Sequence, residues 1–326
     1  MRRFVWTVSL GVVFVCCIAN PGWGQGYKPT RPVEVVVHTD PGGGSDVFAR
    51  AILDMLEKEK LLPQRMNVAN KTGGSGVTAM AYLAEKKGDD HTIGFFTNTW
   101  LATPLTRKEA KVTIDQLTPV VRLILEPMIA VVKADAPYKN MNDFVAAAKK
   151  NPGKLNQSGG SVTAQEALYR LLIQKSTGAQ WNFISFPGGG ERISNLLGGN
   201  VQLLMAQPQE ISEHIRSGGV RVIAVLGDKR LAGFPNVPST KEQGIDIPTL
   251  DQARGVLAPP GVAKEVVQYW EDLFGRFVKT ASWKKYLADN QLEDAFLKSQ
   301  EVAGFWRKQT DLLRNLLQEA GVKVAR

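Results

Sequence analysis

Cysteine is scarce in this chain of 326 residues, which contains only Cys16 and Cys17. Both lie in an N-terminal segment that we expect to be cleaved, so the mature chain is expected to lack disulfides, thiolate nucleophiles and cysteine metal sites. Histidine is almost as scarce. His38, His91 and His214 are scattered without the spacing of zinc ligands, so the sequence predicts no metal site.

Signatures of catalysis are missing as well. The sequence has no Gly-x-Ser-x-Gly elbow, no Walker lysine after a glycine-rich turn and no recognisable acid–base pair of carboxylates. Residues 74–79 have the glycine pattern of a dinucleotide site, but the acid expected about twenty residues further on is absent. We therefore predict no catalytic residue, no cofactor and no enzymatic activity.

Basic blocks and interleaved aromatic residues are also lacking. The 40 lysines and arginines exceed the 31 acids, but the excess is spread along the chain, which argues against a nucleic-acid partner. A mild positive charge of this kind favours the capture of small anions. No second long apolar run follows the first 18 residues, so we expect the mature protein to be soluble.

The N-terminus has the layout of a secretory signal peptide. Arg2 and Arg3 precede an apolar run from Val5 to Ile18, which is too short to span a bilayer, and small residues follow at Gly22 and Gly24. We expect residues 1–24 to be a signal peptide that is cleaved near Gly24, which places the mature protein in the periplasm.

The remaining chain of about 300 residues is long enough for two domains. Apolar strands alternate with amphipathic helices, which predicts α/β domains with open, mostly parallel sheets. From residue 262 onward the pattern predicts helices, with Trp270, Phe274 and Phe277 in the core. The predicted strands are 31–38, 66–70, 92–97, 128–133, 155–158, 182–186, 201–205 and 220–226.

Two glycine-rich turns occupy matching positions in the two halves of the chain. Each follows a predicted strand and opens a helix: Pro41-Gly42-Gly43-Gly44-Ser45-Asp46 and Pro187-Gly188-Gly189-Gly190. Without Cβ atoms, such turns expose backbone amides at the positive end of a helix, where a carboxylate binds without a charged side chain. Glycine at these positions also permits tight strand–helix packing, and one turn alone does not separate the two interpretations.

Polar residues at other strand ends are further candidates, because ligands of open α/β sheets bind at the carboxyl ends of strands. The same residues also commonly cap the following helix, so both roles stay open for each. His38, just before the first glycine turn, fits a ligand contact and a packed strand end equally well. The candidates are Thr97, Asn98, Ser158, Gly159, Gly160, Ser161 and Thr163.

The chain resembles the substrate-binding proteins of tripartite tricarboxylate transporters, the Bug family, over nearly its whole mature length. The motifs that carry the resemblance are Arg31-Pro-Val-Glu-Val-Val-Val, Pro41-Gly-Gly-Gly-Ser-Asp, Asn70-Lys-Thr-Gly-Gly-Ser-Gly, Phe186-Pro-Gly-Gly-Gly-Glu, Leu196-Leu-Gly-Gly-Asn-Val, Val237-Pro-Ser-Thr-Lys-Glu-Gln-Gly and Arg254-Gly-Val-Leu-Ala-Pro-Pro-Gly. Gln252-Ala-Arg-Gly-Val is similar to the tricarboxylate-binding branch of that family.

The resemblance implies a two-lobed, type II-like Venus-flytrap fold with two crossing strands, which closes on a ligand carboxylate. Lobe 1 would comprise residues 25–122 and 254–326, and lobe 2 residues 123–253. The loop Pro41–Asp46 would hold one carboxylate through its backbone amides and Ser45, helped by ordered water, and the turns at 159–161 and 188–190 would line the facing lobe. We add Gln207 and Arg254 as ligand-binding candidates, and Arg192 either as a clamp for a second carboxylate or as a solvated helix residue.

The resemblance therefore predicts a monomeric binding protein that delivers a di- or tricarboxylate, or an aromatic acid, to integral-membrane transporter subunits. Two alternatives stay open: presentation of the ligand to a membrane sensor kinase, and an exported enzyme built on the same scaffold.

Overall fold

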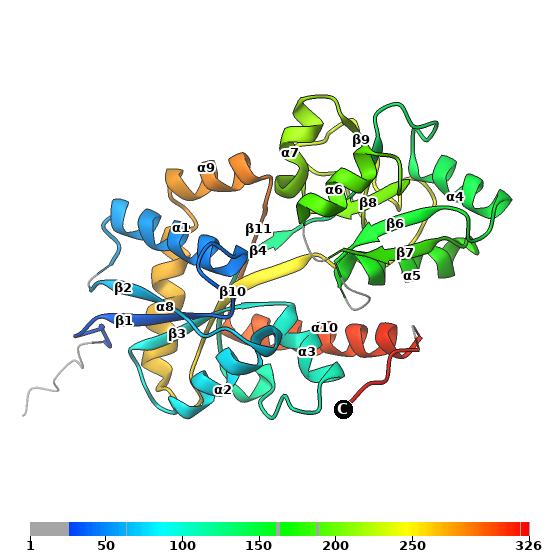
Figure 1. Cartoon of the computed structure of the whole chain (residues 1–326). Helices are drawn as coiled ribbons and strands as arrows, with labels where there is room; N and C mark the ends of the chain where they lie inside the picture. Colours follow the sequence, from blue (N-terminus) through cyan, green and yellow to red (C-terminus); the bar gives the residue numbers. More distant parts are fainter. Residues whose placement is uncertain (1–25, 63, 161–163, 187–188, 320, 326) are drawn as a thin grey trace, which may run out of the picture.

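The protein forms two α/β lobes joined by extended segments, as seen in a computed structural model (Figure 1). The structure describes residues 26–62, 64–160, 164–186, 189–319 and 321–325. The predicted signal peptide and the candidates Ser161, Thr163 and Gly188 lie outside these ranges. Among the described residues, no helix combines the length and the apolarity needed to cross a membrane.

The first lobe is built on a six-stranded sheet with the order β11-β4-β10-β3-β1-β2. Strands β2, β1 and β3 are parallel, whereas β10 runs antiparallel to both β3 and β4. Its elements are β1 (Val33–Val37), α1 (Gly44–Lys58), β2 (Met66–Asn70), η1 (Gly74–Gly76), α2 (Val77–Glu85), β3 (Thr92–Thr97), α3 (Thr99–Thr106), η2 (Ile114–Gln116), β4 (Thr118–Glu126), β10 (Gln252–Ala258), α8 (Lys264–Phe277), α9 (Ala281–Asn290), β11 (Glu293–Lys298) and α10 (Ser299–Glu319).

The second lobe is built on a five-stranded sheet with the order β7-β6-β8-β5-β9. Strands β7, β6 and β8 are parallel, and β5 is antiparallel to its neighbours β8 and β9. Its elements are β5 (Ile129–Lys133), α4 (Met141–Lys150), β6 (Asn156–Gly159), α5 (Gln165–Thr177), β7 (Asn182–Ser185), α6 (Gly189–Leu197), β8 (Leu203–Ala206), α7 (Pro208–Arg216) and β9 (Val220–Val225).

Each sheet buries both of its faces. In β1, Val33, Val35 and Val37 pack with residues of α1 and α8, whereas Val36 packs with α2 on the opposite face. This division follows from the alternation of side chains along a strand. In the second lobe, α4 and α5 cover one face, while α6 and α7 cover the other. The predicted core residues Trp270, Phe274 and Phe277 are fully buried.

The chain crosses between the lobes twice. The first crossing runs from β4 to β5 over two residues, and the second runs from β9 to β10 through residues 226–251. The lobe boundaries predicted at 122 and 254 fall inside β4 and β10, because the pairing of these two strands continues from Glu126 to Gln252.

Helix α10 links the lobes on one side of the molecule (Figure 1). Its residues Trp306 and Leu313 belong to a continuous apolar cluster that also contains Leu168 and Tyr169 of α5. Beyond this cluster, Lys175 of α5 forms an ion pair with Glu319 at 2.8 Å. The two lobes therefore share part of one core.

The prediction that the chain is helical from residue 262 onward is wrong at residues 293–298. Residues 293–298 form β11, which pairs with the edge of the first sheet through an interrupted antiparallel register with β4. Gln291 adopts a left-handed conformation at φ 54°, which ends α9 and turns the chain toward the sheet. Pairing with an available sheet edge outweighs the helical pattern of this segment.

Candidate functional site

A cavity of about 310 Å³ lies between the two lobes. The first lobe contributes residues of α3 and α10 and Gln252 of β10, the second lobe contributes residues of α5, α6 and α7, and the second crossing contributes Leu250. Two larger hollows, of about 930 and 850 Å³, are lined by residues of the first lobe alone. A further cavity, of about 570 Å³, lies between residues 229–233 and the end of α9, but no helix N-terminus lines it, so the smaller cavity is the better candidate for enclosing a ligand between the lobes.

Helix N-termini converge on this cavity. Asn98, Ala164 and Gln207 precede the first turns of α3, α5 and α7, and all three line the cavity. None of the three makes a side-chain capping hydrogen bond. The Thr99 amide of α3 bonds to Thr97, the third amide of each helix bonds to a cap carbonyl, and Pro208 of α7 has no amide, so each helix leaves only one or two first-turn amides without a bond to the described residues at the positive end of its dipole. This arrangement favours an anion.

The first glycine turn is shaped by Asp46. The carboxylate of Asp46 accepts hydrogen bonds from the Gly42 amide at 2.9 Å and from Asn70 Nδ2 at 3.0 Å. Arg50 donates to the same carboxylate and is the main cause that lowers the pKa of Asp46 to about 2. The charge of Asp46 is thus used to hold the turn in place.

Arg254 lies against the same turn. Its Nη1 donates to Ser45 Oγ at 3.3 Å, and its Nη2 lies 3.5 Å from the point where a Cβ on Gly44 would stand. Its Nε donates to Glu126 at 2.8 Å, and both side chains of this ion pair are nearly inaccessible to solvent. A guanidinium therefore stands beside the glycine turn, with its charge partly balanced by Glu126.

His38 is packed in this region. Trp100 donates its indole N–H to His38 Nδ1 at 3.0 Å, which leaves the proton of the neutral ring on Nε2. Burial, and then the charge of Arg254, lower the pKa of His38 to about 4. His38 is therefore neutral near pH 7 and serves as a hydrogen-bond acceptor for Trp100.

Thr97 and Asn98 join α3 to its neighbours. Thr97 is buried, and its Oγ accepts the Thr99 amide hydrogen bond at 3.3 Å. Asn98 Nδ2 donates to the Asp251 carbonyl, and Asn98 Oδ1 accepts from the Ala253 amide. Asn98 thus ties the N-terminus of α3 to the second crossing while it lines the cavity.

In the second lobe, Ser158, Gly159 and Gly160 have different positions. Ser158 and Gly159 are buried, and a Cβ on Gly159 would lie 2.3 Å from the ring of Phe183. Gly159 is therefore required by packing. Gly160 lines the cavity, and its amide donates to the Glu166 carboxylate at 2.6 Å.

Arg192 is neither free nor solvated. It lies 3.5 Å from Glu166 and 3.3 Å from Glu210, and its side chain is 15% exposed. Gly189 and Gly190 form the first residues of α6, ahead of Arg192. Glu166 and Glu210 were not predicted from the sequence, because a glutamate in the first turn of a helix is usually explained by the helix dipole alone.

Four predicted candidates therefore meet in the cavity, namely Asn98, Gly160, Arg192 and Gln207. The turn at residues 42–46 adjoins it through Arg254 and Glu126, which contacts the cavity residue Gln252 at 2.7 Å.

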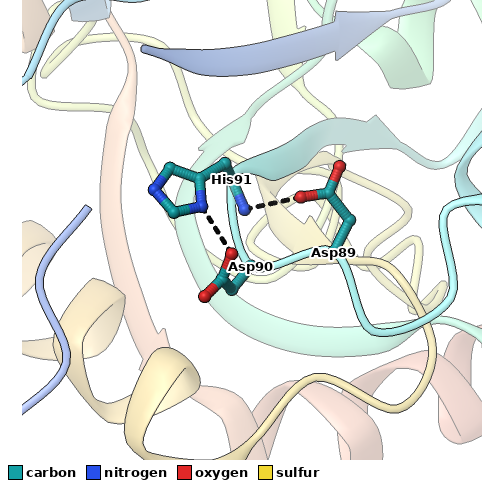
Figure 2. Close-up of side chains that lie close together, drawn as sticks. All are labelled: Asp89, Asp90 and His91. Atoms are coloured by element: carbon teal, nitrogen blue, oxygen red, sulfur yellow. Dashed lines mark hydrogen bonds and ion pairs between the residues drawn. The ribbon is translucent and has the colours of Figure 1, made fainter. Parts of the chain in front are cut away.

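A separate cluster, Asp89, Asp90 and His91, has the residue types of a metal site (Figure 2). His91 Nε2 accepts the Thr30 amide hydrogen at 2.9 Å, so Nδ1 carries the proton and donates to Asp90. Asp89 accepts from the His91 amide at 3.0 Å and from the Thr92 hydroxyl at 2.8 Å. With both ring nitrogens of His91 engaged, the cluster anchors the N-terminal segment and leaves no imidazole lone pair for a metal.

The fold and this inter-lobe site define a two-lobed solute-binding receptor of the periplasmic binding type. Residues 48–322 match the tripartite tricarboxylate transporter family receptor, and the chain belongs to this family. The family resemblance predicted from the sequence is confirmed. It is a family of substrate-binding receptors that act in the periplasm.

Individual relatives agree with this assignment. The chain is 30% identical to the Cupriavidus necator "UPF0065 protein in gbd 5'region" over 98% of this chain and 95% of that protein. A TctC solute-binding protein from Polaromonas is similar over 89% of this chain and 99% of its own, with 27% identity and a TM-score of 0.78. A Rhodopseudomonas palustris protein with adipate shares the fold, with 23% identity, a TM-score of 0.77 and coverage of 90% of this chain and 99% of its own.

Proposed function

We propose that this protein captures a small carboxylate between its lobes, as a monomer and without catalysis, and delivers it to integral-membrane transporter subunits. The observation that carries the proposal is the convergence of the N-termini of α3, α5 and α7, each with one or two unbonded first-turn amides, on the inter-lobe cavity. Unpaired amides at helix N-termini bind carboxylates without a formal positive charge. The fold relative that contains adipate supports the same ligand class.

We propose that the first glycine turn supplies a further carboxylate contact. The amides of Gly42, Gly43 and Asp46 are bonded to Asp46, Asp40 and Thr39, so Gly44 and Ser45 at the start of α1 offer the remaining amides, with Arg254 beside them. In the second lobe, Gly160, Gly189 and Gly190 would approach the ligand from the opposite side. The lobes would close by rotation about the two crossings, one after Glu126 and one before Gln252.

A ligand screen tests the proposal directly. We expect one or more small carboxylates to raise the midpoint of thermal unfolding, because a ligand that binds only the native state stabilises it. The screen would compare mono-, di- and tricarboxylates with uncharged amides of the same size at constant ionic strength. A panel in which no carboxylate shifts the midpoint would refute the proposal.

Gly44→Ala separates ligand contact from folding. A Cβ at residue 44 would meet only Arg254 Nη2, at an ordinary 3.5 Å, so the variant is expected to fold with wild-type stability. The added methyl would hold a carboxylate away from the amides and weaken its binding by about 1–3 kcal/mol. Calorimetric titration with the carboxylate found in the screen measures this loss.

Gly43 is unsuitable for that experiment, because its Cβ would lie 2.6 Å from Thr39 Cβ and would disturb the turn itself. Gly275→Ala on α8 is the matched control, since its new methyl would contact only the ring of Phe296, at 3.7 Å. If Gly44→Ala binds the ligand as tightly as Gly275→Ala does, the glycine turn has a packing role and makes no contact with the ligand.

A further inference from the structure

The lobes make a further contact at the cavity of about 570 Å³ beside α9. Lys229, in the second crossing, forms an ion pair with Glu293 at the start of β11. Lys229 is on the side of the second lobe, because Leu231 and Phe234 of the same segment pack into the core of that lobe. Glu293 belongs to the first lobe, where β11 pairs with β4. We call the pair of Lys229 and Glu293 the latch, since it joins one lobe to the other.

The latch and the candidate ligand site lie on opposite sides of the strands that cross between the lobes. Strands β4 and β10 are neighbours in the first sheet, with β11 beyond β4 and with β3 and β1 beyond β10. Glu293 is on β11, whereas Asn98 follows β3 and the first glycine turn follows β1. The crossing strands therefore form an axis between the latch and the ligand site. A rotation that brings the lobes together over a ligand would move Lys229 away from Glu293.

Asp251 faces the latch from the second crossing. Its neighbours Leu250 and Gln252 line the ligand cavity, whereas the carboxyl group of Asp251 lies near Lys229 and Glu293. This division follows from the alternation of side chains along an extended chain. Asp251 is 7% exposed, and its Oδ1 is a buried atom without a hydrogen-bond partner among the described residues. A titratable group is therefore buried between the ligand site and the latch.

Ionisation of Asp251 would weaken the latch. The charged and titratable groups around its carboxyl group are Glu293 of β11, Lys229 and Asp228 of the crossing, and Tyr169 of α5. Burial, and then Glu293, raise the pKa of Asp251 to about 7. Above this pH the buried charge lacks a full set of partners and repels Glu293, which disfavours the arrangement of the lobes that buries it. Lys229 opposes this effect only in part, because its charge is already paired with Glu293.

We propose that Lys229, Glu293 and Asp251 form a latch that depends on pH. With Asp251 protonated, the latch holds the ligand cleft open, and with Asp251 ionised, the lobes are free to close. The movement itself needs no ligand, whereas its effect on ligand capture rests on the proposed function. The protein would capture its ligand more readily as the pH rises through neutrality.

Distances between spin labels on the two lobes test the proposal in the absence of any ligand. The mature chain is expected to contain no cysteine, so Lys58→Cys on α1 and Ser194→Cys on α6 place one label on each lobe, both at exposed positions. We expect a shorter mean distance at pH 8.5 than at pH 5.5, because ionised Asp251 disfavours the latched arrangement. The same distance at both pH values would overturn the inference and leave the proposed function intact.

Three variants with the same labels identify the groups that control the movement. Asp251→Asn cannot ionise, so it should keep the longer distance at pH 8.5. Lys229→Gln removes the ion pair, so it should show the shorter distance already at pH 5.5. The matched control is Lys241→Gln, which breaks an exposed ion pair with Asp228 within the crossing and should behave as the wild type does. If Asp251→Asn responds to pH like the wild type, or if Lys229→Gln keeps the wild-type distance at pH 5.5, the inference is wrong.

Discussion

Replacing Arg254 by methionine is expected to lower the free energy of unfolding by about 3–5 kcal/mol, because the buried Glu126 then loses its charged partner. Glu126 is 4% exposed, and Arg254 Nε is its cationic neighbour at 2.8 Å. Gln252 would still donate to the carboxylate, but an amide does not neutralise its charge. Chemical denaturation at pH 7.5 measures the change.

A double variant separates stability from ligand binding. Adding Glu126→Gln to Arg254→Met removes the unpaired charge, so most of the lost stability should return. Carboxylate binding should remain weak, because the guanidinium beside the glycine turn is still missing. The matched control is Arg216→Met, whose ion pair with Glu213 is exposed and whose loss should change stability by about 0.5 kcal/mol or less. An unaltered denaturation midpoint for Arg254→Met would contradict the account of this pair.

A second large effect is expected at the crossing between the lobes, where Asp251 is 7% exposed. Burial, and then the nearby Glu293, raise the pKa of Asp251 to about 7, while Lys229 lowers it. In the unfolded chain this carboxyl group ionises near pH 4. As the pH rises from about 4 to 7, the unfolded state therefore loses a proton that the folded state keeps, and the native protein becomes less stable.

Asp251→Asn cannot ionise and should escape this loss. We expect the variant to match the wild type near pH 4.5 and to be more stable by about 2–4 kcal/mol at pH 8, from the pKa difference between the two states. Differences between variant and wild type are compared at each pH, so that the separate titration of His38 cancels.

The control for this experiment is Asp246→Asn, an exposed carboxylate in the same crossing. Because its side chain is exposed, this substitution should change stability by about 0.5 kcal/mol or less at both pH values. A stability difference for Asp251→Asn that is the same at both pH values would mean that Asp251 ionises at its ordinary pKa in the folded protein.

The positions of the strands along the sequence were easier to predict than the pairing of one strand with another. The strands predicted at 66–70 and 92–97 match β2 and β3, and in β3 a fully buried run that ends at polar residues marks the strand locally. Strand β11 was missed, because the sheet edge that it joins lies far away in the sequence. The pairing of Arg254 with Glu126 joins residues of β10 and β4, which local patterns do not connect.

In the candidate site, too, the features set by local sequence were predicted and those set by contacts between distant residues were not. Glycine turns and helix starts are visible in the sequence, so Asn98, Gly160, Arg192 and Gln207 could be named in advance. Glu166 and Glu210 could not, because their importance depends on α5, α6 and α7 bringing their first turns together around one cavity. Asp46 was assigned to the ligand, whereas its carboxylate is used within its own turn.

The order of strands in the first sheet also determines when that sheet can be completed during synthesis. Strand β10 lies between β3 and β4, yet the ribosome makes it only after all five strands of the second lobe. The second lobe can therefore fold while the first sheet still lacks the strand that joins its two parts. Until residues 252–258 emerge, β3 and β4 each present an open edge, which is a template for pairing with other chains. The C-terminal part of the chain thus protects its N-terminal part from aggregation.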